Sequence, residues 1–200
     1  MFNSLKKILV SFFAFIFTGF FNPLDAHIEE KAKKVLIVYF SYTGNTEKIA
    51  NKTVKALGSS CKVDIHRIET FNEYPEDRNE LRDQAEREAN DDKFRPELKS
   101  PNIDDIKSYD LIIIGTPTWW YKAPKAVIAF LEAQDLSAKK VCFFVTHAGG
   151  PGACLDDMHK ACKGANFGPE VKIYCTFPVN GEFDEKAVEN WISDLRKELI

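Results

Sequence analysis

Five short apolar runs alternate along the chain with longer segments that have the spacing of amphipathic helices. The first run, residues 35–40, is continuously β-branched or aromatic, which is typical of a strand buried on both faces. The expected strands are 35–40, 61–68, 111–115, 141–146 and 171–177. The expected helices are 45–57, 76–90, 124–133, 153–163 and 184–199. This alternation predicts an α/β domain with a five-stranded parallel sheet that helices cover on both faces.

Three segments with polar or glycine-rich composition come directly after strands of this expected sheet. They are residues 41–46, 115–121 and 146–152. In doubly wound parallel sheets, ligands bind beyond the carboxyl ends of the strands. The three segments are therefore expected to meet at one edge of the sheet and to form a single binding site.

The first of these segments reads Ser-Tyr-Thr-Gly-Asn-Thr at residues 41–46 and leads into a helix. A helix N-terminus presents free N–H groups, small hydroxyl side chains add donors, and Gly44 permits a tight turn. The segment therefore predicts a neutral phosphate cradle. The Gly-Lys-Ser/Thr sequence of nucleoside triphosphatases is missing, which favours a phosphate that is anchored over one that is transferred. The alternative is an ordinary helix start that Thr43 or Asn45 caps with its own side chain.

These segments carry a resemblance to a known family. Val-Tyr-Phe-Ser-Tyr-Thr-Gly-Asn-Thr at residues 38–46 resembles the phosphate loop of the flavodoxin family. Residues 115–121, Gly-Thr-Pro-Thr-Trp-Trp-Tyr, resemble the family's Gly-x-x-Thr-Trp segment, and residues 146–152 are similar to the glycine-rich loop of a flavodoxin-like subgroup. The resemblance extends over residues 34–200. It implies a flavodoxin-like doubly wound sandwich with strand order 2-1-3-4-5 and FMN as the cofactor.

The resemblance assigns FMN contacts to all three loops. Trp119 is the candidate for stacking on the flavin ring, because an indole shields a flat apolar ring and influences its redox potential. Trp120 and Tyr121 are expected to flank the ring, although a core position for either tryptophan is the alternative. Because adjacent residues of an extended loop point in opposite directions, Trp119 and Trp120 are not both expected to face the ring. The expected FMN-binding residues are Ser41, Tyr42, Thr43, Gly44, Asn45, Thr46, Pro117, Thr118, Trp119, Trp120, Tyr121, Thr146, His147, Ala148, Gly149, Gly150 and Gly152.

The third loop departs from many flavodoxins because it contains no aromatic residue that could cover the second face of the ring. Gly149, Gly150 and Gly152 are expected instead to let backbone amides approach the pyrimidine end of the ring. An uncovered face would admit a second substrate, which suits a reductase. His147 is a candidate donor to the flavin N1–O2 edge or to a substrate, and a histidine hydrogen-bonded to its neighbours is the alternative.

The segment between the second and third expected strands, residues 69–109, is long and polar. Its part from 76 to 90 is dense in Glu, Arg and Ala and is expected to form an exposed charged helix. The alternative is a rim or a dimer arm close to the flavin ring.

These features predict a redox flavoprotein that transfers electrons between a donor and an acceptor. The acceptor is either a partner protein or a small molecule such as a quinone. One alternative is an FMN-dependent quinone-type reductase with a nicotinamide donor. The other alternative is a non-catalytic binding module that keeps the flavodoxin-like fold. No catalytic side chain is assigned.

Residues 1–26 have the order of a secretory signal. Lys6 and Lys7 precede an uncharged apolar stretch at residues 8–21, and Ala26 follows. A membrane-spanning helix needs about 20 apolar residues, so the stretch is short for that purpose. We expect cleavage near Ala26 and export to a bacterial periplasm or to the medium, with an uncleaved membrane anchor as the alternative. Residues 27–33 are then a polar lead-in.

The charge and the cysteines exclude some functions. The net charge of -3 and the lack of a basic stripe with interleaved aromatics argue against nucleic acid as a partner.

The five cysteines contain no Cys-x-x-Cys spacing, so no metal site is expected. Cys61 and Cys142 lie in apolar runs and are expected in the core. Cys154 and Cys162 are too far apart on one helix to form a disulfide. Cys162 with Cys175 is the pair to test first.

Overall fold

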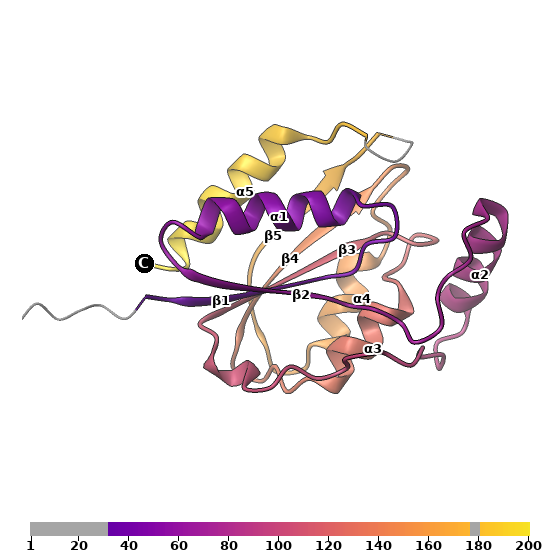
Figure 1. The fold of residues 1–200 in the computed structure, drawn as a ribbon, viewed down its shortest axis with the longest axis horizontal. Helices are drawn as coiled ribbons and strands as arrows, with labels where there is room; N and C mark the ends of the chain where they lie inside the picture. The colour runs from indigo at the N-terminus through magenta and orange to yellow at the C-terminus, as the bar shows by residue number, and fades with distance from the viewer. Residues whose placement is uncertain (1–31, 177–180) are drawn as a thin grey trace, which may run out of the picture. The chain divides into compact units, whose positions relative to one another are not determined.

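The computed structural model describes residues 32–176 and 181–200 and shows a central sheet with helices on both of its faces (Figure 1). Five strands make up this sheet. They are β1 (Lys34–Tyr39), β2 (Lys62–Arg67), β3 (Leu111–Pro117), β4 (Lys140–His147) and β5 (Asn166–Tyr174). All neighbouring strands are parallel, in the order β2-β1-β3-β4-β5. The predicted fold class and strand order are confirmed.

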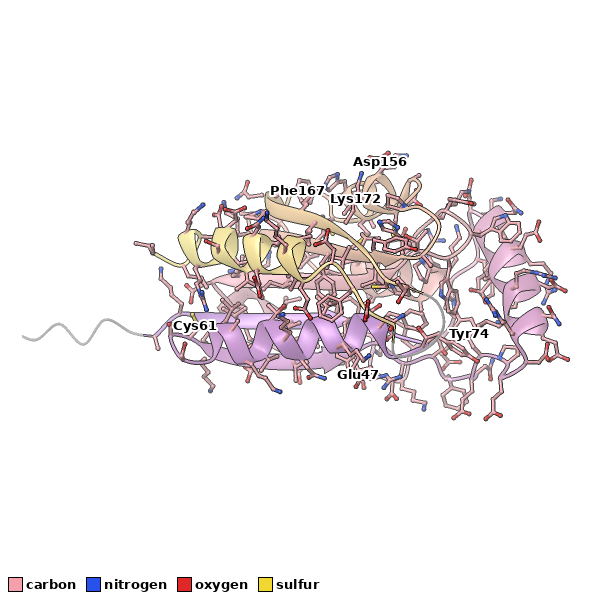
Figure 2. All side chains as sticks on the ribbon, turned by 90° about the horizontal axis from the view of Figure 1, so that it is seen from above. Glu47, Cys61, Tyr74, Asp156, Phe167 and Lys172 are labelled. Atoms are coloured by element: carbon pink, nitrogen blue, oxygen red, sulfur yellow. The ribbon has the colours of Figure 1, made fainter. Side chains whose placement is uncertain are left out.

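The helices divide into two layers and one outlier. They are α1 (Asn45–Leu57), α2 (Arg78–Asn90), α3 (Lys125–Ala133), α4 (Cys154–Ala161) and α5 (Glu185–Lys197), with a short 3-10 turn at Ile106–Ser108. Helices α1 and α5 cover one face of the sheet, and α3 and α4 cover the other (Figure 1). Helix α2 stands beyond the carboxyl ends of the strands, and Figure 2 shows its side chains projecting on most sides.

The alternation of side chains along β1 builds two separate cores. Val35 and Ile37 pack on the side of α1 and α5, whereas Leu36 and Val38 pack on the side of α3 and α4. All four residues are buried, which explains why the run has no polar position. At the centre of the sheet, a Cβ on Gly115 would lie 2.0 Å from the ring of Phe144. The close approach of that ring requires a glycine at this position.

The last strand differs from its prediction. We expected it at residues 171–177, but β5 spans Asn166–Tyr174. Gly168 and Pro169 weaken the strand pattern, yet an edge strand tolerates both. A register shift opposite Val141 and Phe143 of β4 accommodates the irregular start.

The cysteines are all unpaired. The expected pair of Cys162 and Cys175 is wrong, because Cys162 packs on the α3 and α4 side of the sheet and Cys175 packs on the α1 and α5 side. The sheet therefore separates the two thiols. Cys142 is buried as expected, and Cys61 is only half-buried.

The signal segment, membrane-spanning helices and metal sites were also considered in the sequence. The expected signal segment, residues 1–26, lies outside the described residues. Across residues 32–176 and 181–200, no helix combines the length and the apolar character that crossing a bilayer requires. In the same part of the chain, no group of three or more His, Cys, Asp or Glu side chains could hold a metal ion.

Candidate functional site

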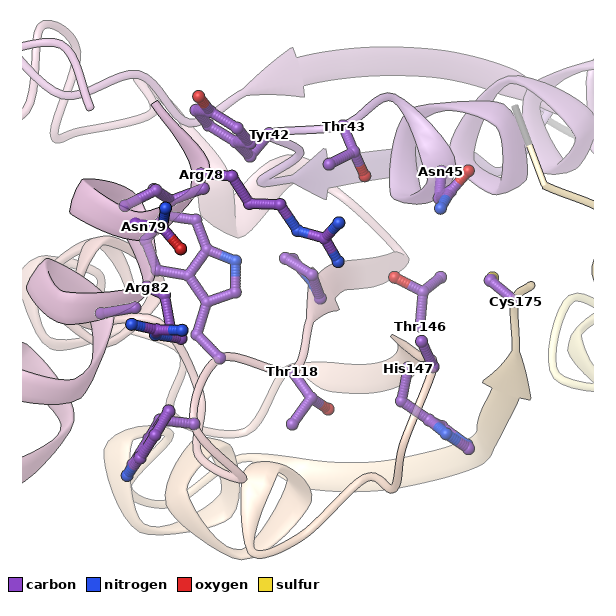
Figure 3. Close-up of a pocket in the computed structure, with 16 residues that line it drawn as sticks. Tyr42, Thr43, Asn45, Arg78, Asn79, Arg82, Thr118, Thr146, His147 and Cys175 are labelled. Atoms are coloured by element: carbon purple, nitrogen blue, oxygen red, sulfur yellow. The ribbon is translucent and has the colours of Figure 1, made fainter. Parts of the chain in front are cut away.

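A cavity of about 520 Å³ lies where the three predicted loops meet (Figure 3). Its volume falls within the range of about 300–1,000 Å³ that is usual for small-molecule sites. Ten of the residues that line it were expected from the sequence: Tyr42, Thr43, Asn45, Pro117, Thr118, Trp119, Trp120, Thr146, His147 and Ala148. Six were not expected: Arg78, Asn79, Leu81, Arg82, Ala85 and Cys175.

Seven expected residues lie beside the cavity and do not line it. They are Ser41, Gly44, Thr46, Tyr121, Gly149, Gly150 and Gly152. Ser41 and Thr46 are buried behind the first loop, where their hydroxyls make hydrogen bonds within the protein. These seven residues shape the backbone that surrounds the cavity.

The start of α1 has the features of an anion site. Gly44 is the N-cap with φ 85°, and neither Thr43 nor Asn45 makes a side-chain cap hydrogen bond to the helix. The alternative in which Thr43 or Asn45 caps its own helix is therefore wrong. A Cβ on Gly44 would meet no atom within 4 Å, so the left-handed φ explains the glycine. By contrast, Asp77 and Asp184 cap α2 and α5 with their carboxylates. In the first turn of α1 the Glu47 N–H donates to the Ser41 hydroxyl, and the N–H groups of Asn45 and Thr46 remain available for a ligand such as a phosphate.

Hydrogen bonds hold the first loop in this shape. The buried Oγ1 atoms of Thr46 and Thr146 lie 2.8 Å apart and connect the start of α1 to the end of β4. The Arg67 guanidinium donates to the Ser41 carbonyl over 3.0 Å, and the Glu47 N–H donates to the Ser41 hydroxyl over 3.3 Å. The loop is therefore positioned by the protein before any ligand binds.

Trp119 belongs both to the core and to the cavity wall. Its half-buried ring packs edge-on against Phe40 at 5.2 Å and against Tyr74 at 4.7 Å between ring centroids. The Tyr42 ring lies 6.2 Å away, and its hydroxyl donates to the Pro75 carbonyl. This cluster fixes the orientation of Trp119, which lines the cavity at the same time.

A tight turn follows Trp119. Trp119 and Lys122 exchange two backbone hydrogen bonds of 3.0 and 2.9 Å, and Trp120 and Tyr121 between them have φ values of 48° and 59°. Two left-handed residues in sequence define a type I′ turn. Because this backbone is not extended, the reason for expecting the two side chains to point in opposite directions does not hold, and Trp119 and Trp120 both line the cavity. That only one of them faces the flavin ring stays a prediction. Left-handed φ costs about 1–2 kcal/mol for each side-chain-bearing residue.

The glycines of the third loop make room for Tyr121. A Cβ on Gly152, which has φ 53°, would lie 2.1 Å from the Tyr121 carbonyl oxygen. That oxygen accepts a hydrogen bond of 2.8 Å from the Ala153 N–H. Cβ atoms on Gly149 and Gly150 would lie 4.0 and 3.7 Å from the Tyr121 side chain. Gly152 therefore allows the aromatic turn to rest on this loop, whereas Cβ atoms on Gly149 and Gly150 would make ordinary van der Waals contacts.

His147 is the last residue of β4 and lies at the edge of the cavity. Its ring lies 6.0 Å from the Tyr174 ring, and Figure 3 shows its side chain directed toward β5. Burial, followed by the positive charge of Lys172, lowers the pKa of His147 below its usual value of 6.5. The imidazole is therefore neutral at pH 7. Its Nδ1 atom is buried and has no hydrogen-bond partner among the described residues, so the alternative of a fully hydrogen-bonded histidine is not observed for this atom.

Helix α2 forms a wall of the cavity, which agrees with the alternative of a rim, although its lining residues were not predicted. The helix is largely exposed, as expected, but its residues 78, 79, 81, 82 and 85 line the cavity. Their spacing is that of one helical face, and this spacing is the signal that could have revealed them. Cys175 was also missed, and Figure 3 shows it near Asn45 at the opposite end of the cavity from α2.

Polar contacts attach α2 to the rest of the domain. Glu88 is buried, and it accepts hydrogen bonds of 3.1 Å from the Tyr74 hydroxyl and 2.8 Å from the Gln84 amide. The Lys122 ammonium donates to the Ala89 carbonyl over 2.9 Å. The aromatic cluster and the tight turn are thus both joined to α2, so the wall is a fixed part of the site.

A parallel sheet of order 2-1-3-4-5 with its cavity at the carboxyl ends of β1, β3 and β4 defines the flavodoxin-like class of doubly wound proteins. A flavodoxin family model matches residues 34–195. The chain belongs to the flavodoxin family.

Relatives of known structure agree with this assignment. A candidate flavoprotein from Bacteroides eggerthii is 32% identical, with a TM-score of 0.65 over 80% of this chain and 96% of that one. A flavoprotein from Lactobacillus acidophilus, solved in complex with FMN, is 25% identical, with a TM-score of 0.61 over 80% of this chain and 99% of that one.

A curated relative has a named activity. An NAD(P)H dehydrogenase (quinone) from Paraburkholderia phymatum is 29% identical over 102 residues. This match covers 50% of the present chain and 45% of the relative, so the chain spans less than half the length of that protein.

Proposed function

We propose that this protein is a redox flavoprotein that binds FMN without a covalent bond and transfers electrons between a donor and an acceptor. The observation that carries the proposal is the uncapped start of α1, which faces the same cavity that Trp119 lines. One end of the cavity suits a phosphate and the other suits a flat aromatic ring. Bound FMN would supply the redox chemistry, and the protein would position the ring and set its environment.

The lining residues divide between the two ends of the ligand. Thr43, Asn45 and the amides at the start of α1 would hold the phosphate. Thr118 and Trp119 would lie against the ring system. The Thr118 N–H donates to the Thr146 carbonyl over 2.9 Å, which fixes the second loop against the third. The relative from Lactobacillus acidophilus, whose complex contains FMN, supports this cofactor.

A second candidate function is that of an FMN-dependent reductase for a quinone, with a nicotinamide donor. Two observations favour it. The cavity extends to a wall on α2, beyond the loops that the flavin is expected to contact. The curated relative is an NAD(P)H dehydrogenase that acts on quinone. A non-catalytic binding module is the remaining alternative, and the experiments below separate it from both redox functions.

Titration of the purified protein with FMN tests the proposal. We expect 1:1 binding with quenched flavin fluorescence, and Asn45→Asp should weaken FMN binding at least about tenfold through repulsion of the phosphate. An acidic residue in the first turn stabilises a helix, so this variant should remain folded. Asn51→Asp is the matched control, because Asn51 is exposed on the same helix and lies outside the cavity.

The outcome of the titration decides between the classes. If the protein binds no FMN, the redox proposal is contradicted, and the non-catalytic binding module is the remaining alternative. If FMN binds, a steady-state assay with NADH or NADPH and a quinone follows. Turnover supports the reductase, and the absence of turnover supports an electron carrier.

We also propose that residues 1–26 direct export and are removed near Ala26. The order of basic, apolar and small residues supports this proposal. The intact mass of the mature protein tests it. A mass that begins close to residue 27 is expected, and a mass that retains Met1 would contradict cleavage.

A further inference from the structure

The charged residues that line the cavity are positive, although the chain as a whole is negative. Among the residues described as lining the cavity, Arg78 and Arg82 are the charged ones, and none is Asp or Glu. The whole chain has a net charge of -3. Helix α2 itself carries four acidic residues, all of them outside the cavity lining: Glu80, Asp83, Glu86 and Glu88. The helix therefore turns its cationic side toward the cavity.

Both arginines approach the cavity from the side opposite the expected phosphate anchor. Figure 3 shows Arg82 on the α2 side, while Asn45 and Cys175 lie at the other end. Arg78 reaches from α2 into the cavity, toward Thr43 and Asn45 (Figure 3). The Arg82 guanidinium thus stays at the α2 end of the cavity, and the Arg78 guanidinium extends between that end and the expected phosphate anchor.

The local contacts leave Arg82 able to bind an anion. Its Nε and Nη2 atoms donate to Asp83 Oδ1 over 3.2 and 2.9 Å. Both side chains are more than half exposed, and ion pairs of this kind are weak. A guanidinium has five N–H donors, so donors remain for a ligand.

FMN is expected to have phosphate donors of its own, apart from these charges. Its phosphate is provided for by the uncapped start of α1, which is a neutral donor site. The isoalloxazine ring is flat and is matched by Trp119. Two guanidinium groups on a separate helix suit a second anion.

We propose that Arg78 and Arg82 form a subsite for the negatively charged group of a second, planar substrate that enters beside the flavin ring. This inference rests on the proposed FMN site and specifies its substrate class. The anionic group is a carboxylate, sulfonate or phosphate, and it belongs either to an acceptor or to the pyrophosphate of a dinucleotide donor.

Equilibrium titrations of the FMN-loaded protein test the subsite without turnover. The probes are 1,4-naphthoquinone-2-sulfonate, neutral 1,4-naphthoquinone and oxidised NAD. The test variant is Arg78→Gln with Arg82→Gln. The matched control is Arg87→Gln, because Arg87 is exposed on the same helix and does not line the cavity.

We expect the native protein and the Arg87→Gln control to bind the sulfonate roughly tenfold more tightly than the neutral quinone. The double variant should lose this preference, and added salt should weaken it. If the double variant loses affinity for NAD instead, the subsite is supported and the anion is that of the donor. Equal affinities of native protein and double variant for both anionic probes would overturn the inference. Weaker FMN binding in the double variant, with the probe affinities unchanged, would also overturn it.

Failure of the proposed FMN function can be distinguished from failure of the arginine subsite. If native protein binds no FMN, the redox proposal is contradicted, and the same probes are then titrated into the flavin-free protein. Arginine-dependent binding of an anionic probe there supports the subsite, and its absence overturns the subsite as well.

Discussion

The buried hydroxyl pair between α1 and β4 gives a quantitative prediction. Thr46 and Thr146 are 1% and 3% exposed, and their Oγ1 atoms lie 2.8 Å apart. Thr146→Val keeps the shape of the side chain but leaves the Thr46 hydroxyl buried without this partner. An unsatisfied buried hydroxyl costs about 1–3 kcal/mol. We expect each single Thr→Val variant to lower the free energy of unfolding by about that amount.

The double variant should cost less than the sum of the two single variants. Once Thr146 is already valine, Thr46→Val removes an unpaired hydroxyl, so the coupling between the two sites should be about 0.5–1.5 kcal/mol. Urea unfolding of the four proteins measures this coupling. The pair also positions the start of α1, so FMN affinity should fall in each single variant.

Thr53→Val is the control for this cycle. Thr53 is also buried on α1, but its hydroxyl donates to the Ile49 carbonyl within the helix. It should therefore show no coupling to Thr146→Val. Strictly additive effects of Thr46→Val and Thr146→Val, or single variants with native stability, would refute this account of the loop.

Three further predictions concern packing, thiols and pH. Gly115→Ala should lower the free energy of unfolding by about 1–3 kcal/mol, because the new methyl group overpacks against the Phe144 ring. Adding Phe144→Leu should restore part of this stability in thermal unfolding, and a neutral effect of Gly115→Ala would contradict the packing. Thiol titration should find five thiols in denaturant and, in the native protein, no more than the half-buried Cys61 reacting readily; fewer than five in denaturant would indicate a disulfide. Burial, then the hydrogen bond to Asp64, raises the pKa of Tyr109 to about 12 from 10.0. Because the folded state keeps this proton longer, its contribution to stability is present below pH 10 and is lost between pH 10 and 12. Tyr109→Phe should reduce that loss in unfolding measured across this window, and an unchanged pH profile would contradict it.

The sequence was sufficient to predict the sheet, because four strands are marked by short apolar or alternating runs whose length and β-branched or aromatic residues favour strands. The start of β5 was not predictable from the same pattern. Gly168 and Pro169 oppose strand formation locally, and they are accommodated only because β5 is an edge strand. That property depends on strand order, which local propensity does not contain.

The site was predicted in part for a similar reason. The loops after β1, β3 and β4 converge by topology, so their residues could be expected at one cavity. The turn at Trp120 and Tyr121 was missed because neither residue is a usual type I′ turn residue such as Asn or Gly. The charged surface helix was favoured over the rim, and the lining residues of α2 were not predicted, because a charged, exposed helix gives no indication of which face meets the domain. Tertiary contacts of Glu88 and Lys122 determine that orientation.

Comparison of FMN with riboflavin tests the central claim most directly. The two flavins share the ring and differ in the phosphate, for which the uncapped start of α1 is the expected anchor. We expect purified protein to bind one FMN per chain and to bind riboflavin at least roughly tenfold more weakly. Equal affinity for both flavins, or binding of neither, would contradict the phosphate anchor at residues 41–46.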